Sequence, residues 1–200
     1  MGRAYTVLDH SNETSRSSSC WCAAALMRFP EFGGVFAYNR RVDIIAEFER
    51  VIDALTAAAV EYAVCGGFAV NIHGHVRATT DIDLLVPAEH LAGAVAAVKA
   101  IGFGFEAGPI PFGVGTPARR EIHRISRIDG TAALTLDLMV VAPVFERTWA
   151  HRQRVAWRGR ELCVVSLAGL AEMKRLAGRP QDLADLDSLG LVGVELDVDD

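Results

Sequence analysis

Asp81 and Asp83 lie in a run whose residue types suit the binding of a divalent cation. The run from Asp81 to Val86 alternates acidic and apolar residues before it becomes wholly apolar. Successive side chains of a strand point to opposite faces, so the two aspartates share one face, about 7 Å apart at Cα, and Ile82 and Leu84 face a core. Carboxylate oxygens are the ligands that Mg²⁺ prefers. The spacing therefore predicts a metal-binding strand.

A pair of glycines, Gly66 and Gly67, comes before this strand, between an apolar run at 62–65 and a short helix-like run at 68–74. Glycine has no Cβ, so a phosphate can approach its backbone closely, and the free N–H groups at a helix start attract anions. Arg77 and Thr79 follow, close enough to the aspartates to contact a phosphate, although both could equally be ordinary loop residues. The segment predicts a phosphate-binding turn.

A third aspartate, Asp137, lies in a predicted strand at 132–141. The dipeptide Asp129-Gly130 is a strong hairpin signal that joins this strand to one at 121–128. Leu136 and Leu138 share a core-facing side of the strand, which leaves Asp137 on the other side. Asp137 is therefore a candidate to join the other two aspartates.

Lys174 lies in a predicted helix at 166–177, which Ser166 would cap and Gly178 would end. As a compact cation it could neutralise a triphosphate, or it could be a solvated helix residue. Asp182 and Asp185 share one face of a last predicted helix at 180–189. They could hold Lys174 or Arg179 in place.

The remaining pattern predicts an alternation of helices and strands. Apolar residues at steps of three and four predict a helix from about residue 41, and Pro87 opens a second helix that ends near residue 101. Residues 104–117, with four glycines and three prolines, are predicted as a loop. A second hairpin is predicted from strands at 155–157 and 162–165.

Composition predicts one globular domain. The chain has 200 residues, of which 51% are hydrophobic and 22% charged, a size that supports a single core. We expect residues 1–40, with a serine-rich tract at 11–19, to be a disordered arm or an over-extended translation start, 41–190 to be the domain, and 191–200 to be an acidic tail. No run reaches the roughly 20 apolar residues of a membrane span and no signal peptide is visible, so we expect a cytoplasmic protein with no membrane partner.

The net charge of −5 argues against a general polyanion binder. Residues 117–160 nevertheless hold nine arginines against four acids. This local excess could steer RNA or a phosphorylated acceptor, or it could be a set of solvated strand edges.

The order of glycine turn, Asp-x-Asp strand, later aspartate and lysine helix resembles the nucleotidyltransferase superfamily typified by DNA polymerase β. The local run from Gly66-Gly67 through Arg77-x-Thr79-x-Asp81-Ile82-Asp83 is similar to the AbiEii-like toxins and their single-domain relatives. The resemblance implies a small α/β (α+β) fold, with a mixed β-sheet flanked by helices and a short helical C-terminus. It also implies two Mg²⁺ ions, with Mn²⁺ as a substitute, bridged by Asp81 and Asp83.

In this resemblance Asp137 holds the catalytic ion and helps to deprotonate the acceptor hydroxyl, while Gly66, Gly67, Arg77, Thr79 and Lys174 bind the NTP. Many members carry Ser where this chain has Gly67, so a hydroxyl that would contact phosphate is missing there. The implied function is nucleotide transfer from NTP to a macromolecule, tRNA or protein, as in a toxin with an antitoxin partner. The alternatives are an antibiotic nucleotidyltransferase that modifies a small-molecule hydroxyl, and a non-catalytic nucleotide-binding module.

Overall fold

The computed structural model describes residues 43–130 and 132–194 of the chain. The described residues form a seven-stranded sheet in the order β3-β4-β5-β2-β1-β7-β6. The strands are β1 (Ala63–Val64), β2 (Asp81–Val86), β3 (Phe105–Phe112), β4 (Arg120–Asp129), β5 (Ala132–Val140), β6 (Gln153–Trp157) and β7 (Arg160–Val164). The helices are α1 (Ile44–Ala57), α2 (Gly66–Ile72), α3 (Ala88–Ala100), the 3₁₀ turn η1 (Pro143–Phe145), α4 (Glu146–Ala150), α5 (Leu167–Ala177) and α6 (Pro180–Ser188).

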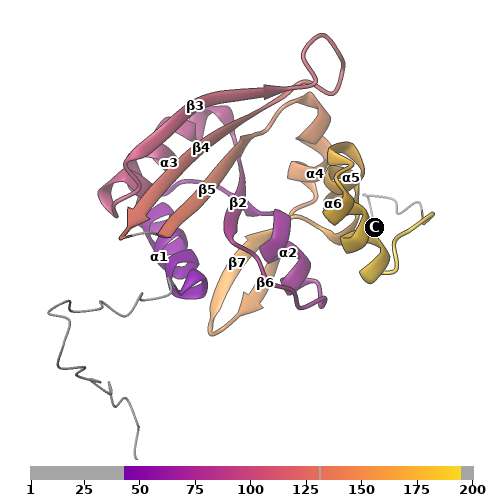
Figure 1. The fold of residues 1–200 in the computed structure, drawn as a ribbon, viewed down its shortest axis with the longest axis horizontal. Helices are drawn as coiled ribbons and strands as arrows, with labels where there is room; N and C mark the ends of the chain where they lie inside the picture. Colours follow the sequence, from indigo (N-terminus) through magenta and orange to yellow (C-terminus); the bar gives the residue numbers. More distant parts are fainter. Residues whose placement is uncertain (1–42, 131, 195–200) are drawn as a thin grey trace, which may run out of the picture. The chain divides into compact units, whose positions relative to one another are not determined.

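The sheet is mixed in direction, as expected from the sequence. Strands β2 and β5 run parallel at its centre, and β1 pairs antiparallel with β2 and parallel with β7. Strands β3, β4 and β5 form an antiparallel meander, and β6 and β7 form a hairpin. A mixed sheet flanked by helices confirms the predicted fold class (Figure 1).

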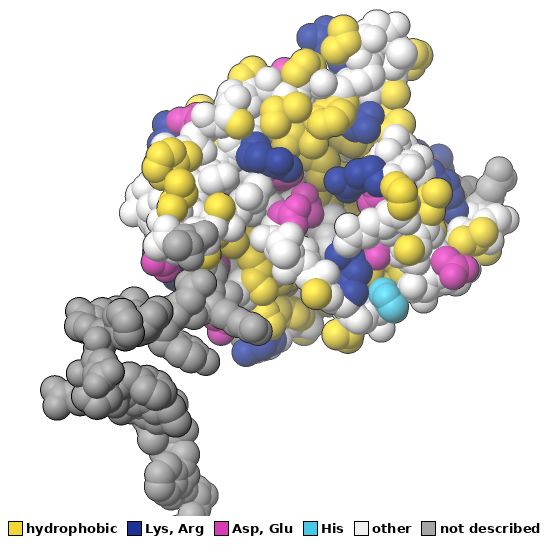
Figure 2. Space-filling model, viewed as in Figure 1, with side chains coloured by type: hydrophobic (Ala, Val, Ile, Leu, Met, Phe, Trp, Pro, Cys, Tyr) yellow, Lys and Arg dark blue, Asp and Glu magenta, His cyan; other side chains and the backbone are white. Residues whose placement is uncertain are grey.

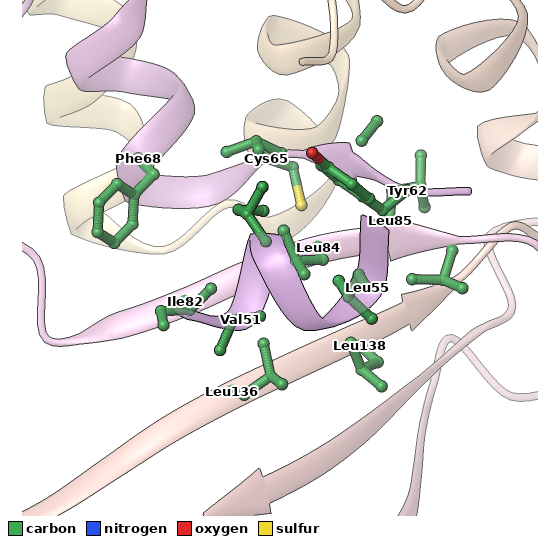
Figure 3. Close-up of a cluster of buried hydrophobic side chains, with 14 of the residues drawn as sticks. Val51, Leu55, Tyr62, Cys65, Phe68, Ile82, Leu84, Leu85, Leu136 and Leu138 are labelled. Atoms are coloured by element: carbon green, nitrogen blue, oxygen red, sulfur yellow. The ribbon is translucent and has the colours of Figure 1, made fainter. Parts of the chain in front are cut away.

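The core lies between the sheet and the helices α1 and α3. The side chain of Asp43 caps α1 by accepting hydrogen bonds from the backbone N–H groups of Ile45 and Ala46, and the helix then buries one apolar stripe. Figure 3 shows the buried side chains gathered from α1 (Val51, Leu55), β2 (Ile82, Leu84) and β5 (Leu136, Leu138). Each such side chain contributes roughly 1.5–3 kcal/mol, so this packing fixes which face of β2 and β5 is left for chemistry.

Helices α5 and α6 form a C-terminal pair, which Figure 1 shows on the opposite side of β2 from α1. The Ser166 hydroxyl accepts a hydrogen bond from the Gly169 N–H (3.1 Å), and Gly178 ends α5 at φ +63°. Both contacts are those predicted from the sequence. The short helix α2 contacts α5, which brings the C-terminal pair close to the glycine turn.

The prediction of a loop at 104–117 was wrong, because the first part of this segment forms β3. Its two prolines, Pro109 and Pro111, cannot donate a hydrogen bond. They are tolerated because β3 is the outer strand of the sheet, and a bulge lies between Glu106 and Pro109. The turn η1 and helix α4 were not predicted either.

The predicted arm, 1–40, lies outside the described residues, as do residues 195–200 of the predicted tail. Leu191, placed at the start of that tail, is buried against Ala171 and Leu186, so the packed region reaches at least this residue. Within the described ranges, no helix is long and apolar enough to cross a membrane.

Candidate active site

The three predicted aspartates lie on one face of the central sheet. The register of the parallel pair β2–β5 sets Asp83 directly beside Asp137. Asp81 lies two residues before Asp83, and therefore on the same face. On the opposite face Ile82 and Leu136 are fully buried in the core, so the apolar packing holds the carboxylates outward.

Crowding of negative charge is strongest at Asp83. Burial raises the pKa of its carboxyl group to about 6, and the charges of Asp137 and Asp81 add to the rise, against a lowering by the hydrogen bond from the Gly67 N–H. The neighbouring Cys65 thiol is fully buried, and burial followed by the charges of Asp83 and Asp137 raises its pKa well above the usual value. A cation on this face would relieve the repulsion.

Asp137 has a cationic partner in Arg124, from the neighbouring strand β4. The register pairs the two residues directly, and the guanidinium donates from Nε to Oδ1 (2.8 Å) and from Nη2 to Oδ2 (2.7 Å). Arg124, Asp137 and Asp83 therefore form a row across three adjacent strands.

The donor set fits a hard divalent cation, because it consists of carboxylate oxygens on a crowded face. Among residues 43–130 and 132–194, however, no three His, Cys, Asp or Glu side chains are grouped so that they could hold a metal ion. Both oxygens of Asp137 are engaged by the Arg124 guanidinium. Asp81 and Asp83 are the residues whose oxygens could hold such an ion first.

The two glycines are the first residues of α2, whereas the sequence predicted a turn that ends the preceding strand and a helix that begins only at residue 68. Gly66 has φ +58°, and a Cβ there would lie 1.9 Å from the Asp83 Oδ2. A Cβ on Gly67 would lie 2.5 Å from the Thr79 Oγ1 and 3.1 Å from the Arg77 Nη2. Both positions therefore require glycine for close packing within the protein.

The Thr79 hydroxyl takes up the space in which a side chain at residue 67 would begin. It also donates to the backbone carbonyl of Asp81 (3.2 Å). In superfamily members with Ser at the position of Gly67, the serine side chain would carry a hydroxyl into this space. Here Thr79 supplies one from the segment that leads into β2.

Arg77 connects the glycine turn to helix α6. Its Nη2 donates to the Asp185 Oδ2 (3.1 Å). Its Nε lies 2.7 Å from the Asp185 Oδ1, yet this N–H makes no hydrogen bond of acceptable angle, so the contact is an ion pair only. The backbone N–H of Arg77 donates to the side chain of Asn71 (2.7 Å), which fixes the segment against α2.

Lys174 is buried, with only 4% of its side chain exposed, and it lies between two carboxylates. Its Nζ is 3.2 Å from the Asp182 Oδ1 and 2.6 Å from the Asp185 Oδ2. Burial raises the pKa of Asp182, but the hydrogen bond from Arg179 and the charge of Lys174 outweigh burial and lower it overall. Lys174 thus binds α5 to α6, and direct contact with a nucleotide stays a prediction.

Sequence reasoning did not assign three arginines to the site, although it named Arg179 as a possible partner of Asp182 and Asp185. The hydrogen bond to Asp182 raises the pKa of Arg179, and the charges of Asp83 and Asp81 add to the rise. Burial lowers the pKa of Arg120, and the nearby charge of Arg179 adds to this. Arg124 is the third. In Figure 2 acidic side chains lie in a hollow near the middle of the face, with basic side chains around them.

A family model described as aminoglycoside-2''-adenylyltransferase matches residues 47–189. A comparison with curated proteins finds no match. Among solved structures, a proposed nucleotidyltransferase from Thermotoga maritima is 15% identical, with a TM-score of 0.51, over 74% of this chain and 92% of that one.

Two antibiotic-modifying enzymes are similar in the same way. The lincosamide antibiotic adenylyltransferase LnuA, bound to lincomycin, is 16% identical with a TM-score of 0.50, over 72% of this chain and 95% of that one. ANT(2'')-Ia, in complex with adenylyl-2''-tobramycin, is 18% identical with a TM-score of 0.52, over 74% of this chain and 86% of that one. At these identities the likeness shows the fold alone.

None of these comparisons names an AbiEii-like toxin, so that finer resemblance is not confirmed. The family match covers most of the described chain, including the glycine turn, the three aspartates and the α5–α6 pair. The match to this family of adenylyltransferases supports an enzyme instead of a non-catalytic binding module. The chain is therefore a nucleotidyltransferase that belongs to the aminoglycoside-2''-adenylyltransferase family.

Proposed function

We propose that the protein transfers an adenylyl group from ATP to a hydroxyl group of a small molecule, with aminoglycoside-type antibiotics as the first class to test. The observation that carries the proposal is the row of aspartates across β2 and β5, in a chain that matches an adenylyltransferase family over this whole region. Two proteins of similar fold are described with tobramycin and lincomycin. We place the reaction in the cytoplasm, where ATP is available.

In the proposed reaction the acceptor oxygen attacks the α-phosphorus of ATP, the bond from this phosphorus to the bridging oxygen breaks, and pyrophosphate leaves. Asp81, Asp83 and Asp137 would hold Mg²⁺, or Mn²⁺ in its place, which supplies charge neutralisation for the phosphates when bound. Asp137 takes the proton of the acceptor hydroxyl. These residues need only to hold, orient and accept a proton, and their common face allows all three tasks.

The phosphates lie in this proposal against the glycine turn. Gly67, Thr79 and Arg77 lie together at this end of β2. The Gly67 N–H donates to Asp83 and the Arg77 guanidinium pairs with Asp185, so a phosphate bound here would replace these partners. The close packing of Thr79 and Arg77 on Gly67 supports the grouping, because it places a hydroxyl and a guanidinium side by side. Gly66 contributes by letting the turn approach Asp83.

A macromolecular acceptor, tRNA or protein, is the weaker candidate. At least six of the nine arginines at 117–160 pair with carboxylates, and at least five of these partners lie outside that segment, for example Glu47 with Arg127 and Glu61 with Arg152. The apparent excess of positive charge is therefore largely neutralised on the folded surface.

The test is incubation of the protein with each α-³²P-labelled NTP and Mg²⁺, with tobramycin, lincomycin, total tRNA or a cell lysate as acceptor. We expect label from ATP to appear in a small-molecule product on thin-layer chromatography, and Asp83→Asn to remove it. The exposed substitution Asp187→Asn is the matched control. Label in a tRNA or protein band would overturn the proposed acceptor class, and no label with any acceptor would contradict the activity.

A further inference from the structure

Arg124 is the only described side chain that engages both oxygens of one of the three site aspartates. The contact is a bidentate pair of short, charge-assisted hydrogen bonds, the strongest arrangement available to an arginine and a carboxylate. Asp137 is nearly buried in this pair, with 7% of its side chain exposed, whereas Arg124 is 46% exposed. The guanidinium thus covers Asp137 from the solvent side.

A guanidinium in this position competes with a metal ion for the same oxygens. A carboxylate has about four lone-pair positions on its two oxygens. The guanidinium takes one position on each oxygen of Asp137, on the side where a single cation would contact both oxygens. Arg124 is the exposed partner of this pair, so its guanidinium can turn toward a ligand in the solvent, but Asp137 would then need another cation in place of Arg124. The other two site aspartates, Asp81 and Asp83, are not engaged by arginine in the described structure.

We propose that Arg124 is a positioning residue that neutralises Asp137 in the free enzyme and leaves it for the triphosphate when nucleotide and metal bind. A bidentate arginine suits a phosphate as well as it suits a carboxylate, so the guanidinium exchanges one anionic partner for another. Asp137 is then free for the metal ion. This inference rests on the proposed function, since it assumes that the aspartates hold a metal ion and that the substrate carries phosphates.

The consequence is positive coupling between nucleotide and metal. A nucleotide that draws Arg124 away raises the affinity of Asp137 for the metal ion, and reciprocity requires that the metal ion raises the affinity for nucleotide by the same factor. The free enzyme would therefore be held with its third carboxylate blocked. Arg124→Gln should remove both the block and the coupling.

The test measures Mn²⁺ binding to the full-length chain by the electron paramagnetic resonance signal of free Mn²⁺, with and without a non-hydrolysable ATP analogue. Without nucleotide we expect Arg124→Gln to bind Mn²⁺ about 5-fold or more tightly than the wild type. The increase in Mn²⁺ affinity that the ATP analogue causes should be smaller in this variant than in the wild type. Arg124→Lys keeps the positive charge but cannot form the bidentate contact, so its Mn²⁺ affinity should lie between those of the wild type and Arg124→Gln. Arg154→Gln is the control, since Arg154 pairs with Glu161 on an exposed hairpin (2.8 Å) and should leave binding unchanged.

Two outcomes separate this inference from the proposed function. Mn²⁺ binding that depends on Asp83 but is equal or weaker in folded Arg124→Gln overturns the role of Arg124 alone. Mn²⁺ binding that persists in Asp83→Asn overturns the metal site, and with it both proposals. Circular dichroism of each variant establishes that the fold is intact.

Discussion

At the scale of single residues, Asp83 has the strongest electrostatic signature of the site. We expect Asp83→Asn to abolish adenylyl transfer, because an amide keeps the volume but removes a charge that would hold the metal ion. The fold should be retained, since the neighbouring core residues are untouched. The measurement is the rate of label transfer from ATP, with circular dichroism as the check on folding. Equal rates in variant and parent would contradict the assignment of Asp83.

The pKa of Asp83 predicts an unusual dependence of stability on pH. Its folded value of about 6 lies above the ordinary 3.8, so the folded state binds the proton more tightly than the unfolded state. The stabilising contribution is full below pH 3.8 and is lost as the pH rises through 6, on the order of 3 kcal/mol in total. Without metal, we therefore expect Asp83→Asn to melt above the wild type at pH 7–8, and the two to converge near pH 4.

Thermal melting between pH 4 and pH 8, in chelator and in Mg²⁺, measures this effect. Mg²⁺ should raise the melting temperature of the wild type at pH 7–8 and leave that of Asp83→Asn nearly unchanged. A wild type that gains stability relative to Asp83→Asn as the pH rises in chelator would contradict the direction of the pKa shift.

Gly67 and Thr79 form a matched pair of small and larger residues. A Cβ on Gly67 would lie 2.5 Å from the Thr79 Oγ1 and 2.9 Å from its Cβ, so Gly67→Ala should cost roughly 1–3 kcal/mol through overpacking. In Gly67→Ala combined with Thr79→Gly the space is free again, and the penalty of the alanine should fall. Urea unfolding of both single variants and the double variant gives the coupling energy. Additive penalties would show that the two residues do not share this space.

Residue types alone could predict the aspartates but not Arg124. Asp137 alternates with the leucines at 136 and 138, and successive side chains of a strand point to opposite faces. Neighbouring residues were therefore enough to assign a face to Asp137. The partner of Asp137 depends on register, and a hairpin turn centred on Asp129-Gly130 would set Ile122 opposite it. The structure instead pairs Asp129 with Ala132, which brings Arg124 to that place.

At the scale of elements, helices α5 and α6 are joined by charge. Lys174→Met should lower the free energy of unfolding by about 3–5 kcal/mol, because it leaves two buried carboxylates without their shared cation. We expect the free energy of ATP binding to change much less than the free energy of unfolding. The dissociation constant for ATP is measured at a temperature where the variant is folded. Lys99→Met, at an exposed lysine that pairs with Glu106, is the control. A large rise in the ATP dissociation constant at unchanged stability would instead support direct phosphate binding by Lys174.

Strand β3 could not be predicted because the signals that mark a loop also occur on sheet edges. Its prolines and Gly108 are typical of turns, yet at an outer edge the missing N–H groups need no partner. Apart from η1 and α4, the helices and the other strands were predicted to within a few residues, since periodicity and caps report them locally. Edge position is a property of the whole sheet, and local sequence does not contain it.

At the scale of the whole molecule, charge has to be counted on the folded surface instead of along the chain. The nine arginines at 117–160 predict a basic region only as long as their partners are unknown. Folding brings Glu47, Glu49, Asp53 and Glu61, from α1 and the segment after it, to four of these arginines. Such pairing between distant segments lowers the positive charge that the local excess of arginines would otherwise offer to a nucleic acid.

The last prediction concerns the first 38 residues. Deleting them should leave the melting temperature and the transfer rate essentially unchanged, because every proposed site residue lies from Gly66 onward and the core cluster is built from Phe48 to Met173. A serine-rich tract such as 11–19 buries too little apolar area to offset roughly 1–2 kcal/mol of ordering entropy per residue. The comparison is between full-length and truncated protein, by thermal melting and by label transfer from ATP. The apolar residues at 21–36 could each contribute up to roughly 1.5–3 kcal/mol if buried, so a truncated protein that aggregates or melts many degrees lower would place them within the fold.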